Sequence, residues 1–176
     1  VLSCIGPRGL IDDGLSKIEK LLKTENARVN WLGYVSSTGV YGDRQGKWVD
    51  EESKLDTITI QGKARAMAEK CWLEFSKELN IPMFIFRAGG IYGPDRSIFD
   101  RIKAGNVQKI IKPNQYFNRI HVDDLSGALG AGLESPQLAG TYNIVDDLPT
   151  SGARVLDEAS RMLDIPFFPE VSFSDA

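Results

Sequence analysis

Hydrophobic positions in this chain fall into short unbroken runs, separated by longer segments in which apolar residues recur with a helical period. A short apolar run that ends at glycine, proline or polar residues is typical of a buried strand followed by a turn. Such runs occupy 1–5, 29–35 and 141–145, with a weaker candidate at 107–112 and a further run at 83–94 that enters a glycine-rich loop. The sequence therefore predicts several short strands with turns at their ends.

The segments between these runs predict helices, because their apolar residues repeat every three or four positions. The strongest helical stripe lies within 61–79 and consists of Ala64, Ala68, Cys71, Phe75 and Leu79, and Pro82 ends it. An earlier stripe consists of Ile11, Leu15, Ile18, Leu21 and Leu22, with lysines toward its C-terminal end. Shorter helices are predicted around 98–104, from about 122 onward and over about 151–163.

Strands that alternate with helices of this length are typical of parallel βαβ units, so the predicted fold class is α/β with helices on both faces of the sheet. In open parallel sheets, ligands bind at the carboxyl ends of the strands. Three predicted strand ends carry informative residues: "CIGP" at 4–7, "SSTG" at 36–39 and "RAGGIYGP" at 87–94. We expect a binding site where these ends meet.

The composition narrows the class of protein further. The 176 residues are 42 % hydrophobic and 26 % charged, with a net charge of −3, which is typical of one soluble globular domain. The scattered basic residues indicate no nucleic-acid surface, and no apolar run approaches the roughly 20 residues of a membrane span. Cys4 and Cys71 fit neither a disulfide framework nor a zinc site. We interpret them as buried small apolar residues in a reducing compartment.

The segment "YVSSTGVYGD" (34–43) places three hydroxyl side chains directly after an apolar run. Hydroxyls at a strand end serve as turn or capping groups more often than as catalysts. Its glycines, with Gly46, do not have the GxGxxG spacing of a phosphate-binding loop. The segment alone therefore leaves a catalytic and a structural interpretation open.

Three motifs together resemble a known family. "VSSTGVYGD" is similar to the SSxxVYG segment of the extended short-chain dehydrogenases/reductases, the NAD-dependent epimerase/dehydratase group. "FRAGGIYGP" resembles the LRxxxxYGP strand end of that family, and "NRIHVDDLSGAL" resembles its I-H-V-x-D segment, in the same order and at compatible spacing. The resemblance implies a Rossmann-type doubly wound parallel sheet that binds NAD or NADP, with a small C-terminal substrate region.

The resemblance also implies how the chain is divided. Residues 1–94 correspond to the C-terminal half of the dinucleotide-binding domain, with Val1–Gly6 as its fourth strand. Residues 95–176 correspond to interleaved substrate-region segments and the last strand and helix of the sheet. The glycine-rich phosphate loop of the family is not in this sequence, so we expect the chain to be an internal portion of a longer protein. The residue that separates NAD from NADP would also lie outside it.

By the same resemblance, the site has two sides. The cofactor side comprises Cys4, Ile5, Gly6, Pro7, Ser36, Gln61, Arg65, Arg87, Ala88, Gly89, Gly90 and Ile91. The substrate side comprises Ser37, Thr38, Tyr92, Arg96, Arg119 and His121. Ser37 matches the catalytic serine that hydrogen-bonds a substrate oxygen, and the two arginines are candidates for an anionic group of the substrate, with solvated surface arginines as the alternative.

One departure from the family bears directly on catalysis. Its Tyr-x-x-x-Lys pair is expected on the helix that follows the SSxxVYG segment, but Gln61 and Arg65 stand at those positions. A tyrosine phenol exchanges protons near neutral pH only when a neighbouring ammonium lowers its pKa, and glutamine cannot exchange a proton there. The usual catalytic pair is therefore expected to be missing.

Other groups could take part in its place. Tyr41 and Tyr92 lie in strand-end loops where a phenol could reach the nicotinamide, or each ring could pack under its loop with the hydroxyl exposed. His121 could be a structural hydrogen-bonding residue, a substrate contact or a metal ligand. Asp123 or Asp124 is suited to cap the helix that begins beside it. With no second histidine, we expect no metal site.

Two functions remain open at this point. The first is an epimerase, dehydratase or reductase that transfers a hydride on a nucleotide-sugar or similar polar substrate. The second is a non-catalytic cofactor sensor or a structural subunit, as a homodimer or in a larger assembly. A third hypothesis is that the 176 residues are a natural short form of such a protein, which cannot bind dinucleotide. We expect the protein in the cytoplasm or an organellar matrix or stroma.

Overall fold

The main sheet of this protein is parallel throughout. The computed structural model describes residues 1–7, 13–25 and 28–176. The main sheet is built from β1 (Leu2–Ser3), β2 (Leu32–Ser37), β3 (Met83–Ala88) and β7 (Gly140–Ile144), in the order β1-β2-β3-β7. Each neighbouring pair runs parallel. The predicted α/β class with a parallel sheet is therefore confirmed.

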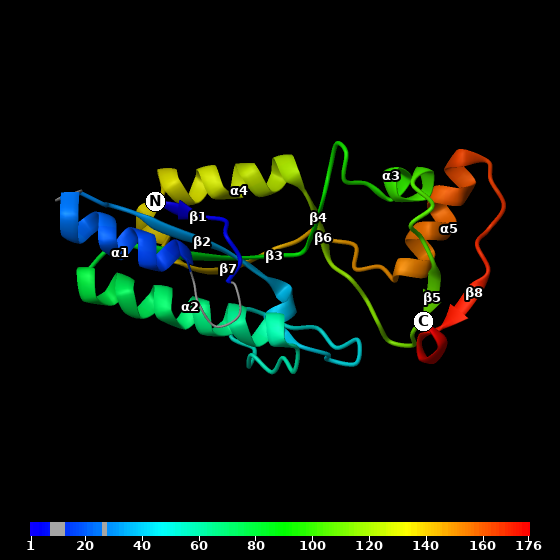
Figure 1. Cartoon of the computed structure of the whole chain (residues 1–176), viewed down its shortest axis with the longest axis horizontal. Coiled ribbons are helices and arrows are strands. Elements are labelled where there is room, and N and C mark those ends of the chain that lie inside the picture. Colours follow the sequence, from blue (N-terminus) through cyan, green and yellow to red (C-terminus); the bar gives the residue numbers. More distant parts are fainter. Residues whose placement is uncertain (8–12, 26–27) are drawn as a thin grey trace.

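Helices cover both faces of this sheet, as Figure 1 shows. The helices α1 (Asp13–Glu25) and α2 (Ile60–Leu79) lie on one face, and α4 (Val122–Glu134) lies on the other. Such two-sided coverage explains why the central strands are almost wholly buried and read as continuous apolar runs. The sheet is thus covered on both faces, as the pattern of strands and helices predicts, and is doubly wound, as the family resemblance implies.

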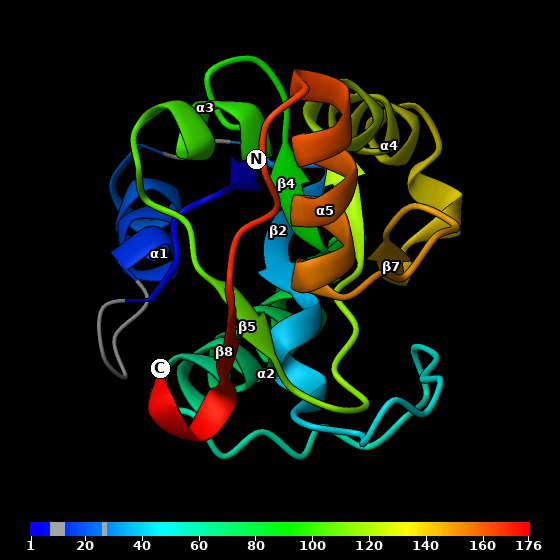
Figure 2. The same cartoon turned by 90° about the vertical axis from the view of Figure 1, so that its right-hand side faces the viewer.

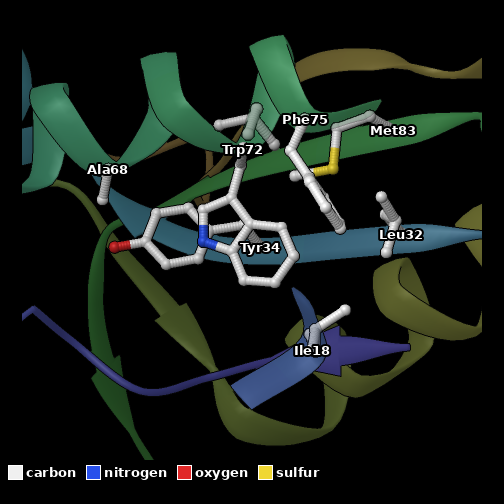
Figure 3. Close-up of a cluster of buried hydrophobic side chains, with 8 residues drawn as sticks. Ile18, Leu32, Tyr34, Ala68, Trp72, Phe75 and Met83 are labelled. Carbon is white, nitrogen blue, oxygen red and sulfur yellow. The ribbon is translucent and has the colours of Figure 1, made fainter. Parts of the chain in front are cut away.

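Successive residues of the central strands point to opposite faces and feed two cores. On the α2 face, Trp72 is fully buried and stacks on Tyr34 of β2, with 5.9 Å between ring centroids. Figure 3 shows Ile18 of α1, together with Phe75 and Met83, around this pair. Large aromatic side chains supply much of the burial that holds a sheet to its helices. This core fixes α2, and with it the segment that carries Gln61 and Arg65.

On the α4 face, the helix backbone lies close to the sheet. Phe84 and Phe86 of β3 form this core with Trp31. A Cβ atom at Gly132 would come within 2.8 Å of the Phe86 ring, so only glycine fits there. The indole nitrogen of Trp31 donates to the Gly132 carbonyl at 2.9 Å. This face is therefore closed by direct packing of backbone on aromatic rings.

The remaining elements form a smaller part beyond the carboxyl ends of β2 and β3 (Figures 1 and 2). Two short parallel pairs occur here: β4 (Gly90–Tyr92) with β6 (Arg119–His121), and β5 (Lys109–Ile111) with β8 (Glu170–Ser172). The helices α3 (Ile98–Lys103) and α5 (Gly152–Leu163) lie beside them. Lys109 of β5 links this strand to α5 and β8, because its amine lies 3.0 Å from Asp157 of α5 and 3.1 Å from Glu170 of β8.

Several expectations from the sequence need correction. The second strand begins at Leu32 rather than at residue 29, and it continues through the two serines to Ser37. In α2, Leu79 is 42 % exposed and Cys71 is half-buried, whereas Glu69 and Trp72 point inward. The expected stripe on this helix was therefore only partly right.

The first strand and its cysteine also differ from expectation. β1 pairs only with β2 among the described residues, so its outer side is open and Leu2 is 42 % exposed. Cys4 is exposed rather than buried. Its thiol is still partly shielded from solvent, and this partial burial raises the pKa of the thiol. Ile11 of the predicted first helix lies outside the described residues.

The described helices include none whose length and apolar content would suit a membrane crossing.

Candidate functional site

An open cleft of about 2110 Å³ lies at the carboxyl ends of the main strands, between the sheet and the smaller part of the molecule. Residues from the three predicted strand ends line the same cleft. Those among the predicted site residues are Cys4, Ser36, Ser37, Thr38, Tyr41, Arg65, Ala88, Gly89, Gly90, Ile91, Tyr92, Arg96 and Arg119. Six other predicted residues are not in its wall: Ile5, Gly6, Pro7, Gln61, Arg87 and His121.

The serines that end β2 have different partners. The hydroxyl of Ser36 is buried and donates to the Glu69 carboxylate at 2.5 Å. The hydroxyl oxygen of Ser37 accepts from the Gly39 amide at 3.1 Å and so caps the short 3-10 helix η1 (Thr38–Tyr41). A serine that accepts in this way still has its own proton to donate. Ser37 can therefore both cap η1 and donate to a ligand oxygen in the cleft.

Beneath the cleft, a buried ion pair joins α2 to β3. Glu69 is 2 % exposed and Arg87 is 6 % exposed, and Nη2 of Arg87 lies 2.8 Å from Oε2 of Glu69. Ser36 and Arg87 are partners in the β2–β3 ladder, so the sheet face toward α2 turns from apolar to polar at its carboxyl end. The helix supplies the matching carboxylate at that level. The pair thus fixes α2 against the strand ends that form the cleft floor.

The ion pair continues into a hydrogen-bond network. Nη1 of Arg87 donates to the Tyr41 hydroxyl at 2.8 Å, and that hydroxyl donates to the Asn143 side chain on β7 at 2.7 Å. Burial by itself would lower the pKa of Arg87, but the hydrogen bonds with Glu69 and Tyr41 outweigh it and raise the pKa. Arg87 therefore stays charged inside the protein.

This network gives Arg87 and Tyr41 structural partners. Nη2 and Nε of Arg87 donate to Glu69, and Nη1 donates to Tyr41 and to the Glu51 carbonyl. The Tyr41 ring is buried, as one interpretation expects, but its hydroxyl is enclosed in the network rather than exposed. Both residues connect secondary-structure elements, and their roles toward a ligand stay predictions.

The first turns of α2 carry the two residues that depart from the family pattern. Thr59 caps the helix, because its hydroxyl oxygen accepts from the Gly62 amide. The exposed Gln61 is the second residue of the helix. Arg65, one turn later, reaches back to the sheet, and its Nη1 donates to the Val35 carbonyl of β2 at 3.2 Å. Its Nη2 lies so close to Gly6 that a Cβ atom there would be 2.9 Å away. The guanidinium group therefore spans the carboxyl ends of β1 and β2 in the cleft.

A glycine pair after β3 lets two backbone segments meet. Gly89 donates to the Ile144 carbonyl at 3.0 Å, and Gly90 donates to the Asn118 carbonyl at 2.9 Å. A Cβ atom at Gly89 would lie 2.8 Å from that same Asn118 oxygen. The glycine is thus required by the close approach of residue 118.

Arg119 and His121 both belong to β6, but only Arg119 lines the cleft. Arg119 donates through Nη1 to the carbonyls of Phe117 and Thr150, both at 3.1 Å. Burial lowers the pKa of Arg119, and the nearby Asp146 carboxylate partly offsets this. His121 is itself the N-cap of α4, because its Nδ1 accepts from the Asp123 amide at 3.3 Å. The expectation that an aspartate caps this helix was wrong.

The partner of His121 along the ladder is Tyr92 of β4. The two rings pack edge to face with 5.2 Å between their centroids. Tyr92 lines the cleft and is 40 % exposed, whereas His121 does not line the cleft. The remaining candidate, Arg96, lies in the cleft wall beside Gly93, with which it forms an isolated bridge.

Sequence reasoning missed Glu69, Glu51 and Asn143, which hold the strand ends together. A charged residue on the apolar face of a helix was the signal for Glu69, since carboxylates are rarely buried without a partner. Glu51 and Asn143 gave no signal, because their bonds join segments 92 residues apart.

Comparisons with known proteins show which proteins this chain resembles. A scan against protein-family models found no match. Among curated proteins, Protein YeeZ of Escherichia coli is 31 % identical over 135 residues, which is 74 % of this chain and 45 % of YeeZ. An uncharacterized UDP-glucose epimerase, YtcB of Bacillus subtilis, is 29 % identical over 122 residues, 63 % of this chain and 38 % of YtcB. The chain thus spans less than half the length of these relatives.

Solved structures match over a larger share of the chain. A functionally unknown conserved protein from Silicibacter pomeroyi superposes with a TM-score of 0.88 and 36 % identity, covering 99 % of this chain and 61 % of that one. A structure assigned as an NAD-dependent epimerase/dehydratase from Methylobacillus flagellatus superposes with a TM-score of 0.71 and 25 % identity. The match covers 90 % of this chain and 56 % of that one. The second of these neighbours confirms the resemblance drawn from the motifs. The chain is an epimerase/dehydratase-like protein with the Rossmann-type fold of the short-chain dehydrogenases/reductases.

Proposed function

We propose that the cleft forms the strand-end part of a nicotinamide-dinucleotide site, and that the protein binds this cofactor together with a nucleotide-sugar-like substrate. The observation that carries the proposal is the position of Arg65. Its guanidinium group spans the ends of β1 and β2 inside a cleft that also presents Ser37. A cation and hydroxyl donors at parallel strand ends suit a ligand with phosphates and ribose hydroxyls.

The residues present support binding better than turnover by the usual route of the family. A bound nicotinamide dinucleotide supplies hydride exchange with a substrate carbon. Ser37 can donate to a substrate oxygen, and Arg65 can hold hydroxyl or phosphate oxygens. Gln61, however, has no proton to exchange near neutral pH, and Arg87 and Tyr41 are engaged with each other. We therefore infer a cofactor-binding protein with little or no turnover through the family's acid–base pair.

A substitution at Arg65 tests the cofactor side. In the full-length protein, Arg65→Ala should raise the Kd for NADH roughly 10-fold or more, because hydrogen bonds to charged groups contribute about 1.5–3 kcal/mol. Isothermal titration calorimetry measures this directly. Lys63→Ala is the matched control, because Lys63 is exposed on the same helix and is not in the cleft wall.

Arg65→Lys should retain part of the affinity, since it keeps the charge but loses the planar fork of donors. An Arg65→Ala protein that binds NADH as tightly as the Lys63→Ala protein would remove Arg65 from the site.

A further inference from the structure

The segment between η1 and α2, residues 42–59, carries a tryptophan that is almost completely exposed. Trp48 has 84 % of its surface accessible, whereas the other two tryptophans, Trp31 and Trp72, are 7 % and 0 % exposed. Tryptophan is among the most buried side chains on average, so an exposed one at a cleft calls for an explanation. Trp48 lines the cleft that also contains Ser37 and Arg65.

This segment is anchored rather than loosely attached. Glu51 holds it to two strands, because its carbonyl accepts from Arg87 of β3 at 3.1 Å and its carboxylate accepts from the Asn143 amide of β7 at 2.7 Å. On the other side of Trp48 in the sequence, Asp43 pairs with Lys112 at 3.1 Å. Trp48 therefore projects from a stretch that is fixed on both sides.

Other residues that line the cleft present similar chemistry. Tyr116 and Phe117 line it and are 58 % and 46 % exposed. Lys112 and Arg119 also line the cleft, so aromatic side chains and cations occur together there. Flat aromatic side chains bind ring-shaped ligand groups by stacking, and neighbouring cations bind attached anionic groups.

We propose that Trp48 is a ligand contact that stacks on a flat ring face of the substrate, either a nucleobase or a sugar, whose anionic group is held by the cations of the cleft. This assignment rests on the proposed function for the identity of the cleft as the ligand site. It adds the residue that recognises the ring and the kind of group recognised.

Fluorescence quenching tests the contact in the full-length protein. Acrylamide should quench Trp48 strongly in the free protein, and saturating UDP-glucose in the presence of NAD should protect it. Trp48→Ala should raise the Kd of UDP-glucose by about 5-fold to 100-fold, in line with the loss of one stacking contact. Trp48→Phe keeps a flat ring and should retain most of the affinity. Leu133→Ala, an exposed apolar position on α4 outside the cleft wall, is the control.

Two further ligands identify the ring. Protection by UMP and not by glucose 1-phosphate assigns the nucleobase to Trp48, and the reverse assigns the sugar. Protection by none of the three ligands overturns the proposal, as does a Trp48 that is already shielded from acrylamide in the free protein or a Trp48→Ala protein with unchanged Kd.

Cofactor binding is followed separately, through the thermal shift caused by NADH. A normal shift without any dependence of UDP-glucose binding on Trp48 would remove this inference and leave the proposed cofactor site intact. Trp48-dependent binding of UDP-glucose without any NADH shift would remove the proposed cofactor site and leave this inference intact.

Discussion

Replacing Glu69 by alanine should lower the free energy of unfolding by about 3–5 kcal/mol, because it leaves Arg87 charged and buried without its carboxylate partner. Arg87 is only 6 % exposed, and its other guanidinium hydrogen bonds go to Tyr41 and a backbone carbonyl, neither of which neutralises it. The Ser36 hydroxyl would lose its acceptor as well. Urea-induced unfolding of the full-length protein, followed by circular dichroism, measures the change.

The matched control is Glu74→Ala on the same helix. Glu74 forms an exposed i,i+4 pair with Lys70, and such surface pairs contribute little to stability. Glu69→Gln should fall between the two, because it keeps one acceptor for Ser36 but no charge. A Glu69→Ala protein as stable as Glu74→Ala would show that the buried pair does not hold α2 against the sheet.

Restoring the family's pair should produce the largest change in activity. We expect the double variant Gln61→Tyr, Arg65→Lys to transfer hydride at least about 100-fold faster than the unmodified protein, which is the lower end of what general acid–base catalysis contributes. The lysine ammonium, one helical turn from the new tyrosine, lowers the pKa of the phenol from its usual value near 10 toward the working range. Reduction of the bound dinucleotide, followed at 340 nm with a panel of nucleotide sugars, gives the rate.

The variant Gln61→Phe, Arg65→Lys separates proton transfer from packing, because it adds the ring without the hydroxyl. It should remain as slow as the unmodified protein. Equal rates for the tyrosine and phenylalanine forms would mean that position 61 does not supply the proton.

The fold was predictable from the sequence because its main signals are local. The buried strands β2 and β3 appear as apolar runs, and the helical stripe of α2 was recognised in part, since two-sided burial leaves such patterns. The strands β4, β6 and β8 were missed, because each has three residues and, unlike the equally short β5, none stands out as an apolar run of its own. The end of β2 was placed too early, since polar serines do not look like strand residues.

The cleft was predictable in outline but not in its internal bonds. Parallel strands bring their carboxyl ends to one edge, so Ser37 and Gly89 were expected to meet there, and they line one cleft. The sequence did not show that Arg87 pairs with Glu69, because the partners lie 18 residues apart on different elements. Nor did it show that residue 51 would reach β7 and that Trp48 would project at the cleft.

The central claim, that the cleft binds a nicotinamide dinucleotide, is tested most directly by titrating NADH and NADPH into the full-length protein while following its thermal stability. A ligand that binds the native state at 100 times its Kd stabilises that state by about 2.7 kcal/mol, so a saturable rise in Tm is expected for at least one of the two. No change in Tm with either nucleotide, together with no heat of binding by calorimetry, would contradict the proposed function.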